Sequence, residues 1–146
     1  MAGYASVTDI ESEFKGTTFG ATDQVSSAEV LAWSDEFSRY VDSIIFTRYS
    51  VPVTDANALL ILKLIIKNFV SARIKRILNE NKIVDDNGIR STEADKLEKQ
   101  ANAMLKQIVS GEIELFDQSK SGILVANSFN VKTNNPPLIH KNEDQW

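Results

Sequence analysis

Side chains that commonly do chemistry are scarce in this sequence of 146 residues, which has one histidine and no cysteine. Without cysteine there is no disulfide, thiolate nucleophile or cysteine-ligated metal. His140 lies between Ile139 and Lys141, so neither a catalytic triad nor a metal site with several histidines can be assembled around it. None of the six glycines cluster into a phosphate-binding loop. We therefore predict no catalytic residue, no metal site and no cofactor, and a protein that is not an enzyme.

Two groups of acidic residues resemble sites only superficially. The stretch 85–88, Asp-Asp-Asn-Gly, lacks the alternating acidic spacing and the closing glutamate of a calcium loop, and it reads as a turn. Asp35, Glu36 and Asp42 could be imagined as an acid–base set. However, Asp35 precedes Arg39 by four residues, which is the spacing of an ordinary surface ion pair on a helix. Neither group changes the prediction of a non-enzyme.

Basic residues gather in one stretch, although the net charge of the whole chain is -4. They lie in the second half of a helix predicted over 55–81, where Glu80 is the acidic neighbour: Lys67, Arg73, Lys75 and Arg76. Three interpretations stay open. These side chains could line a path for DNA through phosphate contacts, meet an acidic face of another subunit, or form the solvated side of a helix.

Length and composition favour one globular domain. Hydrophobic residues make up 42% and charged residues 25% of the chain, which is ordinary for a soluble protein. The N-terminal residues show no basic region followed by an apolar one, so we expect no signal peptide. The most apolar run, 58–66, is far shorter than the roughly 20 residues of a membrane span. We expect no membrane partner.

Apolar periodicity predicts a mainly α protein, a small bundle of three long helices near 27–49, 55–81 and 92–110. A capping box at Thr8 and Glu11 predicts a short N-terminal helix that runs through Phe14. The expected core consists of Trp33, Phe37, Leu62, Ile66, Phe69, Leu105 and Ile108. Residues 59–66 are apolar on nearly every side, which predicts contact with protein all round the helix.

The last thirty residues differ in character from the rest. We divide the chain into a helical domain, 1–116, and an extended arm, 117–146, which is polar and rich in asparagine and allows short β-strands. Its apolar residues are spaced as if to dock on a partner, with the tryptophan as the expected anchor: Ile123, Val125, Phe129, Leu138, Ile139 and Trp146. A solubilising tail is the alternative.

Three stretches, in order along the chain, carry a resemblance to a known family. Residues 4–10, YASVTDI, look like an opening of the form YATxxDL. Residues 41–53, VDSIIFTRYSVPV, resemble IDxYLxxRYxLPL, which leads into a helix. Residues 104–115, MLKQIVSGEIEL, are similar to the closing pattern WLxxIAxGxxxL. Together they resemble the head–tail connector, or adaptor, proteins of tailed bacteriophages. The loop 81–90 and the arm fall outside these patterns.

The resemblance implies a structural protein of the virion neck, between head and tail, that is made in the host cytoplasm. Members of this family form closed rings, typically dodecameric, between the portal and the next tail component, and DNA passes through the lumen. The implied partners are the portal protein, the tail or next neck protein, and further copies of this chain. A ring built head to tail uses two different faces of each subunit. The alternative is a small helical nucleic-acid-binding or regulatory module.

The turn between the first two long helices lies in the second of these stretches and holds Arg48, Tyr49 and Pro52, although the resemblance rests on the order of the three stretches and not on this turn. We expect Tyr49 to bury its ring and keep its hydroxyl near the surface. Arg48 is expected to complement the negative end of its own helix, and Pro52 to set the direction of the next one. A plain helix–helix turn would use the same residues.

Overall fold

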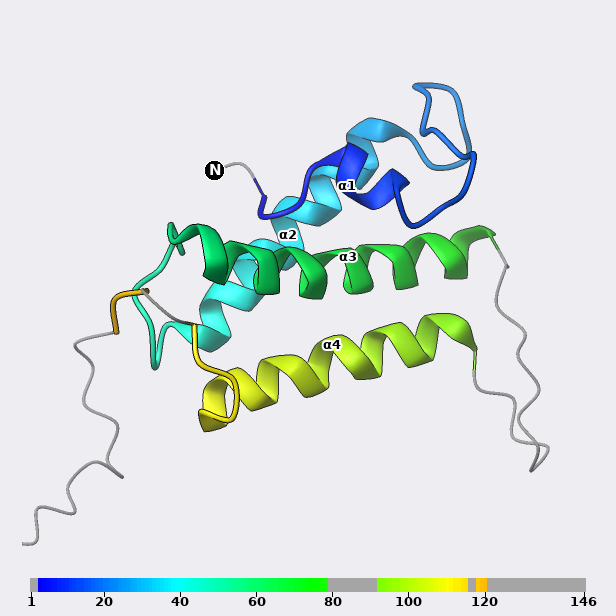
Figure 1. The fold of residues 1–146 in the computed structure, drawn as a ribbon. Helices are drawn as coiled ribbons and strands as arrows, with labels where there is room; N and C mark the ends of the chain where they lie inside the picture. The colour runs from blue at the N-terminus through cyan, green and yellow to red at the C-terminus, as the bar shows by residue number, and fades with distance from the viewer. Residues whose placement is uncertain (1–2, 79–91, 116–117, 121–146) are drawn as a thin grey trace, which may run out of the picture.

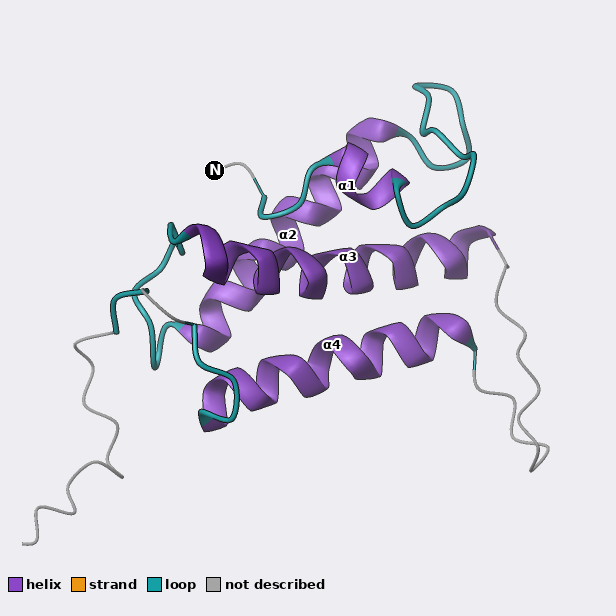
Figure 2. Ribbon diagram, in the orientation of Figure 1, coloured by secondary structure: helices purple, strands orange, loops and turns teal. Residues whose placement is uncertain are grey.

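Four helices form the part of the chain that the computed structural model describes, residues 3–78, 92–115 and 118–120. They are α1 (Val7–Glu11), α2 (Ser27–Ile45), α3 (Ala56–Leu78) and α4 (Glu93–Ser110), and no strand accompanies them in these ranges (Figures 1 and 2). The prediction of a mainly α bundle with three long helices and one short helix is confirmed.

Capping side chains start the long helices where the sequence predicts. The hydroxyl of Ser26 accepts a hydrogen bond from the backbone N–H of Glu29, and the Glu29 carboxylate accepts one from the backbone N–H of Ser26. Thr92 and Asp95 make the same reciprocal pair at the start of α4. Asp55 caps α3 by accepting from the N–H of Ala58 at 2.8 Å. Short-range hydrogen bonds therefore fix all three starts.

The short first helix begins and ends earlier than expected. The predicted capping box at Thr8 and Glu11 is wrong, because Ser6 is the cap and pairs reciprocally with Asp9. Glu11 instead accepts from the N–H of Phe19 at 2.9 Å, which ties down the loop after α1. α1 therefore ends at Glu11 and does not run through Phe14.

α3 is the central element, in contact with each of the other three helices. α4 lies beside it and runs in the opposite direction, while α2 crosses α3 obliquely (Figure 1). Five of the predicted core side chains are buried: Leu62, Ile66, Phe69, Leu105 and Ile108. Trp33 and Phe37 are only partly buried and pack against the core from its edge.

The expected apolar face of α2 is interrupted at its middle. Tyr40, which belongs to the 3.6-residue apolar pattern, is 46% exposed, whereas Ser34 and Ser38 are buried. The cause is the segment 3–6, which lies against α2. The N–H of Tyr4 donates to the Ser38 hydroxyl at 2.9 Å, and the Ser34 hydroxyl donates to the carbonyl of Ala5 at 2.6 Å. Small polar side chains thus let the N-terminal backbone approach the helix.

Most of the arm lies outside the described residues. The expected docking residues and the expected strands from 121 onward are there, as are His140 and the loop 85–88. The described part, 118–120, lies against the α2–α3 turn, where Tyr49 and Lys120 form an isolated antiparallel bridge. In the described ranges no helix is long and apolar enough to cross a bilayer.

Candidate functional site

The two lysines of the basic stretch are paired within the chain. Nζ of Lys67 lies 2.5 Å from Glu13, in the segment that follows α1. Nζ of Lys75 lies 3.3 Å from Glu93 of α4 and 5.2 Å from the ring centre of Phe14. Both lysine side chains are mostly buried, at 18% and 14% exposure. Their charges are therefore largely used to attach α3 to its neighbours.

The two arginines have partners on α2 and on α4. Arg73 contacts α2, with its guanidinium 3.0 Å from Glu36 and 4.9 Å from the ring centre of Trp33. Arg76 pairs with Asp95 at 3.1 Å and with Glu98, both on α4. These hydrogen bonds, Glu98 first, raise the pKa of Arg76. Since the four basic residues contact α2, α4 and the residues around α1, they do not gather on one surface.

Tyr49 ties the α2–α3 turn to the residues that follow α4. Its side chain is among the largest that are fully buried, and its hydroxyl accepts a hydrogen bond from the N–H of Leu115 at 3.2 Å. The expectation that this hydroxyl stays near the surface is wrong, because the chain after α4 covers it. A buried hydroxyl with a backbone partner fixes the position of that chain.

Arg48 lies at the end of α4. Its Nη1 donates to the carbonyl of Val109 at 3.4 Å, and its Nη2 lies 3.7 Å from Glu114. Gly111 ends α4 in the left-handed conformation, φ 89°, and a Cβ there would collide with the guanidinium. The prediction that Arg48 complements its own helix is therefore wrong in its partner, because α2 ends earlier, at Ile45, and the free carbonyls of α4 are in reach.

Tyr4 joins the first motif stretch, residues 4–10, to the same end of the bundle. Its hydroxyl donates to Asp42 of α2 at 2.5 Å and accepts from the N–H of Val53 at 2.9 Å. Burial, and then the hydrogen bond to Asp42, raise the pKa of Tyr4. Burial also raises the pKa of Asp42, by more than the hydrogen bond from Tyr4 lowers it. One phenol thus links the N-terminal segment, α2 and the α2–α3 turn.

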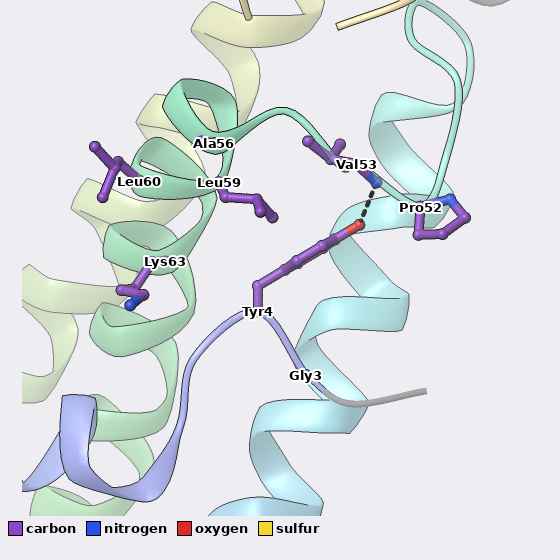
Figure 3. Close-up of a pocket in the computed structure, with 8 residues that line it drawn as sticks. All are labelled: Gly3, Tyr4, Pro52, Val53, Ala56, Leu59, Leu60 and Lys63. Carbon is purple, nitrogen blue, oxygen red and sulfur yellow. Dashed lines mark hydrogen bonds between the residues drawn. The ribbon is translucent and has the colours of Figure 1, made fainter.

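An apolar groove opens between the N-terminal segment and the start of α3 (Figure 3). Its volume is about 480 Å³, and its lining consists of Gly3, Tyr4, Pro52, Val53, Ala56, Leu59, Leu60 and Lys63. Leu59 points towards the Tyr4 ring, whereas Leu60 points outward and is 65% exposed. Lys63 supplies the charge of this lining and is paired with Asp9 at 3.1 Å. We name this feature the Tyr4–Leu60 groove.

The groove also shows where the apolar run of α3 remains uncovered. Leu60 and Leu64, four residues apart on one side of the helix, are 65% and 43% exposed, while Leu62, Ile65 and Ile66 are buried. Contact with protein all round the helix is thus not made by the described residues of this chain. Pro52, which follows Val51 through a cis peptide bond, forms one wall of the groove.

Sequence reasoning missed Tyr4, Ser34, Ser38 and Asp42 as a connected group. The available signal was the spacing of the last three, which places polar side chains four residues apart on one side of α2. What they contact could not be read from that spacing, because the partner is the backbone and ring of a segment 29 to 38 residues away in the chain.

Neither the side chains nor the comparisons assign an activity. Among the described residues, no group of three or more acidic or histidine side chains is placed to hold a metal ion. Comparison with protein-family models, with curated proteins and with solved structures finds no match for this chain.

Proposed function

We propose that this chain is a head–tail connector of a tailed bacteriophage, a structural subunit that assembles into a ring between the portal and the tail. The observation that carries the proposal is the convergence of the three motif stretches. Tyr4 of the first bonds to Asp42 and Val53 of the second, and Tyr49 of the second bonds to Leu115 of the third.

This convergence gives a physical reason for the residue types of the motifs. The opening tyrosine, the Arg-Tyr pair and the glycine that ends α4 all serve one end of the bundle, where Arg48 lies against Gly111. Three unrelated helix ends would not be expected to contact one another through their motif residues. The ordered set of motifs is therefore supported as a single structural unit, and the resemblance to connectors rests on that unit.

The distribution of exposed apolar side chains suits a subunit with two interfaces. Leu60 is exposed on one side of α3, and Phe69, which the exposed Tyr40 contacts edge-on at 5.9 Å, follows it by nine residues. Residues nine apart on an α-helix point in opposite directions. Exposed apolar groups thus occur on opposite sides of α3, as a head-to-tail ring requires.

The basic stretch does not favour the alternative, a nucleic-acid-binding or regulatory module. Its four cations have acidic partners in the same subunit, so phosphate contacts would have to displace existing ion pairs. A wall that lets DNA pass has no need of strong contacts. Lys67, Arg73, Lys75 and Arg76 as lumen or interface residues stay a prediction.

A capture experiment tests the proposed function. The purified chain is mixed with portal-bearing, DNA-filled heads from the phage whose genome encodes it, and bound particles are imaged by electron microscopy. We expect a ring of this chain on the portal vertex. A folded protein that leaves the portal bare and instead selects one DNA sequence would overturn the proposal in favour of a regulator.

A further inference from the structure

The Tyr4–Leu60 groove is an apolar site that the described part of this subunit leaves open. Its volume, about 480 Å³, lies in the range of small binding pockets, about 300–1,000 Å³. Its one cation, Lys63, is already paired with Asp9, so the site has no charge to offer a ligand. An occupant of matching chemistry is apolar, uncharged and extended.

The chain itself contains such a segment directly after its last described residue. Residues 121–131, SGILVANSFNV, are eleven consecutive residues without a charge, in a sequence that is 25% charged. Three adjacent aliphatic residues, Ile123, Leu124 and Val125, lie near its start. We propose that the Tyr4–Leu60 groove receives these three residues from the arm of a second copy of this chain.

The residues directly before this segment, 118–120, lie beside the groove-lining turn. The N–H of Ser50 donates to the carbonyl of Ser119 at 2.7 Å. The side-chain oxygen of Gln118 accepts from the N–H of Thr54 at 3.2 Å, and its amide donates to the carbonyl of Ser50 at 2.8 Å. The arm therefore departs from the α2–α3 turn, whose residues Pro52 and Val53 line the groove.

The direction of departure selects the second copy over the same chain. Tyr49 and Lys120 pair antiparallel, so at Lys120, the last described residue, the chain runs in the direction opposite to residues 49–53 and away from Pro52. Ile123 follows Lys120 by three residues, which span at most about 11 Å when fully extended. To fill its own groove with residues 123–125, the chain would have to reverse within that length. A neighbouring subunit presents the groove without a reversal.

This inference rests on the proposed function in one respect, because a ring places copies of the chain side by side. It adds the device that joins them, an exchanged arm, and thereby gives the outward-facing side of α3 a partner. It also predicts which exposed apolar residue matters for assembly. Leu60 lines the receiving groove, whereas Leu31, which is 46% exposed on α2, does not.

The absence of cysteine allows a direct test by disulfide trapping in the full-length chain. Ala56→Cys marks the groove without removing an anchor, and Ala126→Cys marks the arm next to the three aliphatic residues. The two single variants, one with an affinity tag, are mixed at up to millimolar concentration under mild oxidation. Ala32→Cys, an exposed alanine on α2, replaces Ala56→Cys in the matched control.

We expect the tagged–untagged dimer between positions 56 and 126 to form at least tenfold faster than the dimer between 32 and 126. Adding Leu60→Asp to the groove variant is expected to abolish that advantage, while Leu31→Asp leaves it in place. Circular dichroism confirms that each variant is folded. Equal rates for the two pairs would overturn the proposal.

A double variant, Ala56→Cys with Ala126→Cys, tests the choice of the second copy. A disulfide within one chain, formed at a rate independent of protein concentration, would contradict exchange and place the arm in its own groove. Failure of either trapping experiment while rings still form on the portal would reject the arm exchange alone. Successful trapping in a protein that ignores the portal would keep the exchange and reject the connector.

Discussion

The two halves of α3 relate to their surroundings in opposite ways. In the first half, Leu60 and Leu64 are exposed, and Leu60 lines the Tyr4–Leu60 groove. In the second half, from Lys67 onward, each basic side chain named in the sequence analysis has an acidic partner on another segment of the same chain. Among the described residues, the apolar half of α3 therefore has exposed side chains that nothing covers, whereas the basic side chains of the other half are paired.

This difference teaches where an interface is to be sought. A cluster of basic residues is conspicuous in a sequence, but long charged side chains easily find partners on neighbouring helices, and such pairs contribute little to stability. Exposed leucines at i and i+4 have no partner in the described residues, and their burial by another chain would release water from apolar surface. The groove is therefore the better candidate for assembly.

Replacing Phe69 should have the largest effect, since it lies where the two halves of α3 meet the rest of the bundle. Its ring is 5% exposed and stacks on Phe37 at 5.0 Å. Phe69→Ala should lower the free energy of unfolding by about 3–5 kcal/mol, through lost burial and a residual cavity. Leu60→Ala, on the outward side, should change it by less than about 0.5 kcal/mol. A decrease in the free energy of unfolding below about 1 kcal/mol for Phe69→Ala in urea melts would show that this side chain does not face the core.

The end of the bundle that carries the groove can be tested through Gly111. With φ 89° and the Arg48 guanidinium in the space of a Cβ, Gly111→Ala should destabilise by more than the about 1–2 kcal/mol of the left-handed conformation alone. Gly16→Ala is the matched control, because Gly16 has φ 75° and nothing within 4 Å of its would-be Cβ. The gap between the two variants should close in an Arg48→Ala background. A gap that persists there would show that Arg48 is not its cause.

Ion pairs of the charged half should contribute far less. Arg73 is 41% and Arg76 46% exposed, so Arg73→Gln and Arg76→Gln should each cost less than about 1 kcal/mol, and less still in high salt. Lys106→Gln, on the exposed side of α4 and in no ion pair among the described residues, serves as the control. DNA binding by the isolated protein should be weak and should fall steeply with salt. Tight DNA binding that persists in high salt would instead make the basic half of α3 the better candidate for an interface.

Much of the fold was predictable because it depends on neighbours in the sequence. The caps at Ser26 and Thr92, the left-handed Gly111 and the buried stripe of α4 all follow from spacing within a few residues. The short first helix was misplaced because Ser6 and Thr8 offer overlapping caps, and a two-residue shift separates them. Local sequence patterns thus predict which segments are helical, but they do not decide which of two neighbouring residues caps a helix.

The candidate site was harder to predict because its contacts join residues far apart. Arg48 and Tyr49 were singled out, but their partners, Val109 and Leu115, depend on how α4 lies beside α3. The groove arises only when the N-terminal segment lies next to the start of α3. Leu60 and Leu62 are both leucines of the same apolar run, and only the packing of the other elements on α3 decides that one is exposed and the other buried.

The smallest effect concerns two carboxylates with opposite pKa shifts, one at each end of α3. Burial raises the pKa of Asp42, which accepts from the groove-lining Tyr4, so its contribution to stability is fully present below its unfolded pKa and is lost as pH rises through the folded value. Hydrogen bonds from Thr92, and then from Arg76, lower the pKa of Asp95, so its contribution is present at neutral pH and is lost as pH falls through its folded value. Asp42→Asn keeps an acceptor for the Tyr4 hydroxyl and removes the buried charge. At pH 7 it should therefore leave the protein equally or slightly more stable, by well under about 1 kcal/mol because the site is partly open to water, and the difference should disappear towards acid pH.

Asp95→Asn should instead destabilise the protein at pH 7. Urea melts of both variants and the parent from pH 3 to pH 8 measure this, and two variants that shift stability in the same direction at pH 7 would contradict the assignment of opposite electrostatic roles to the two ends.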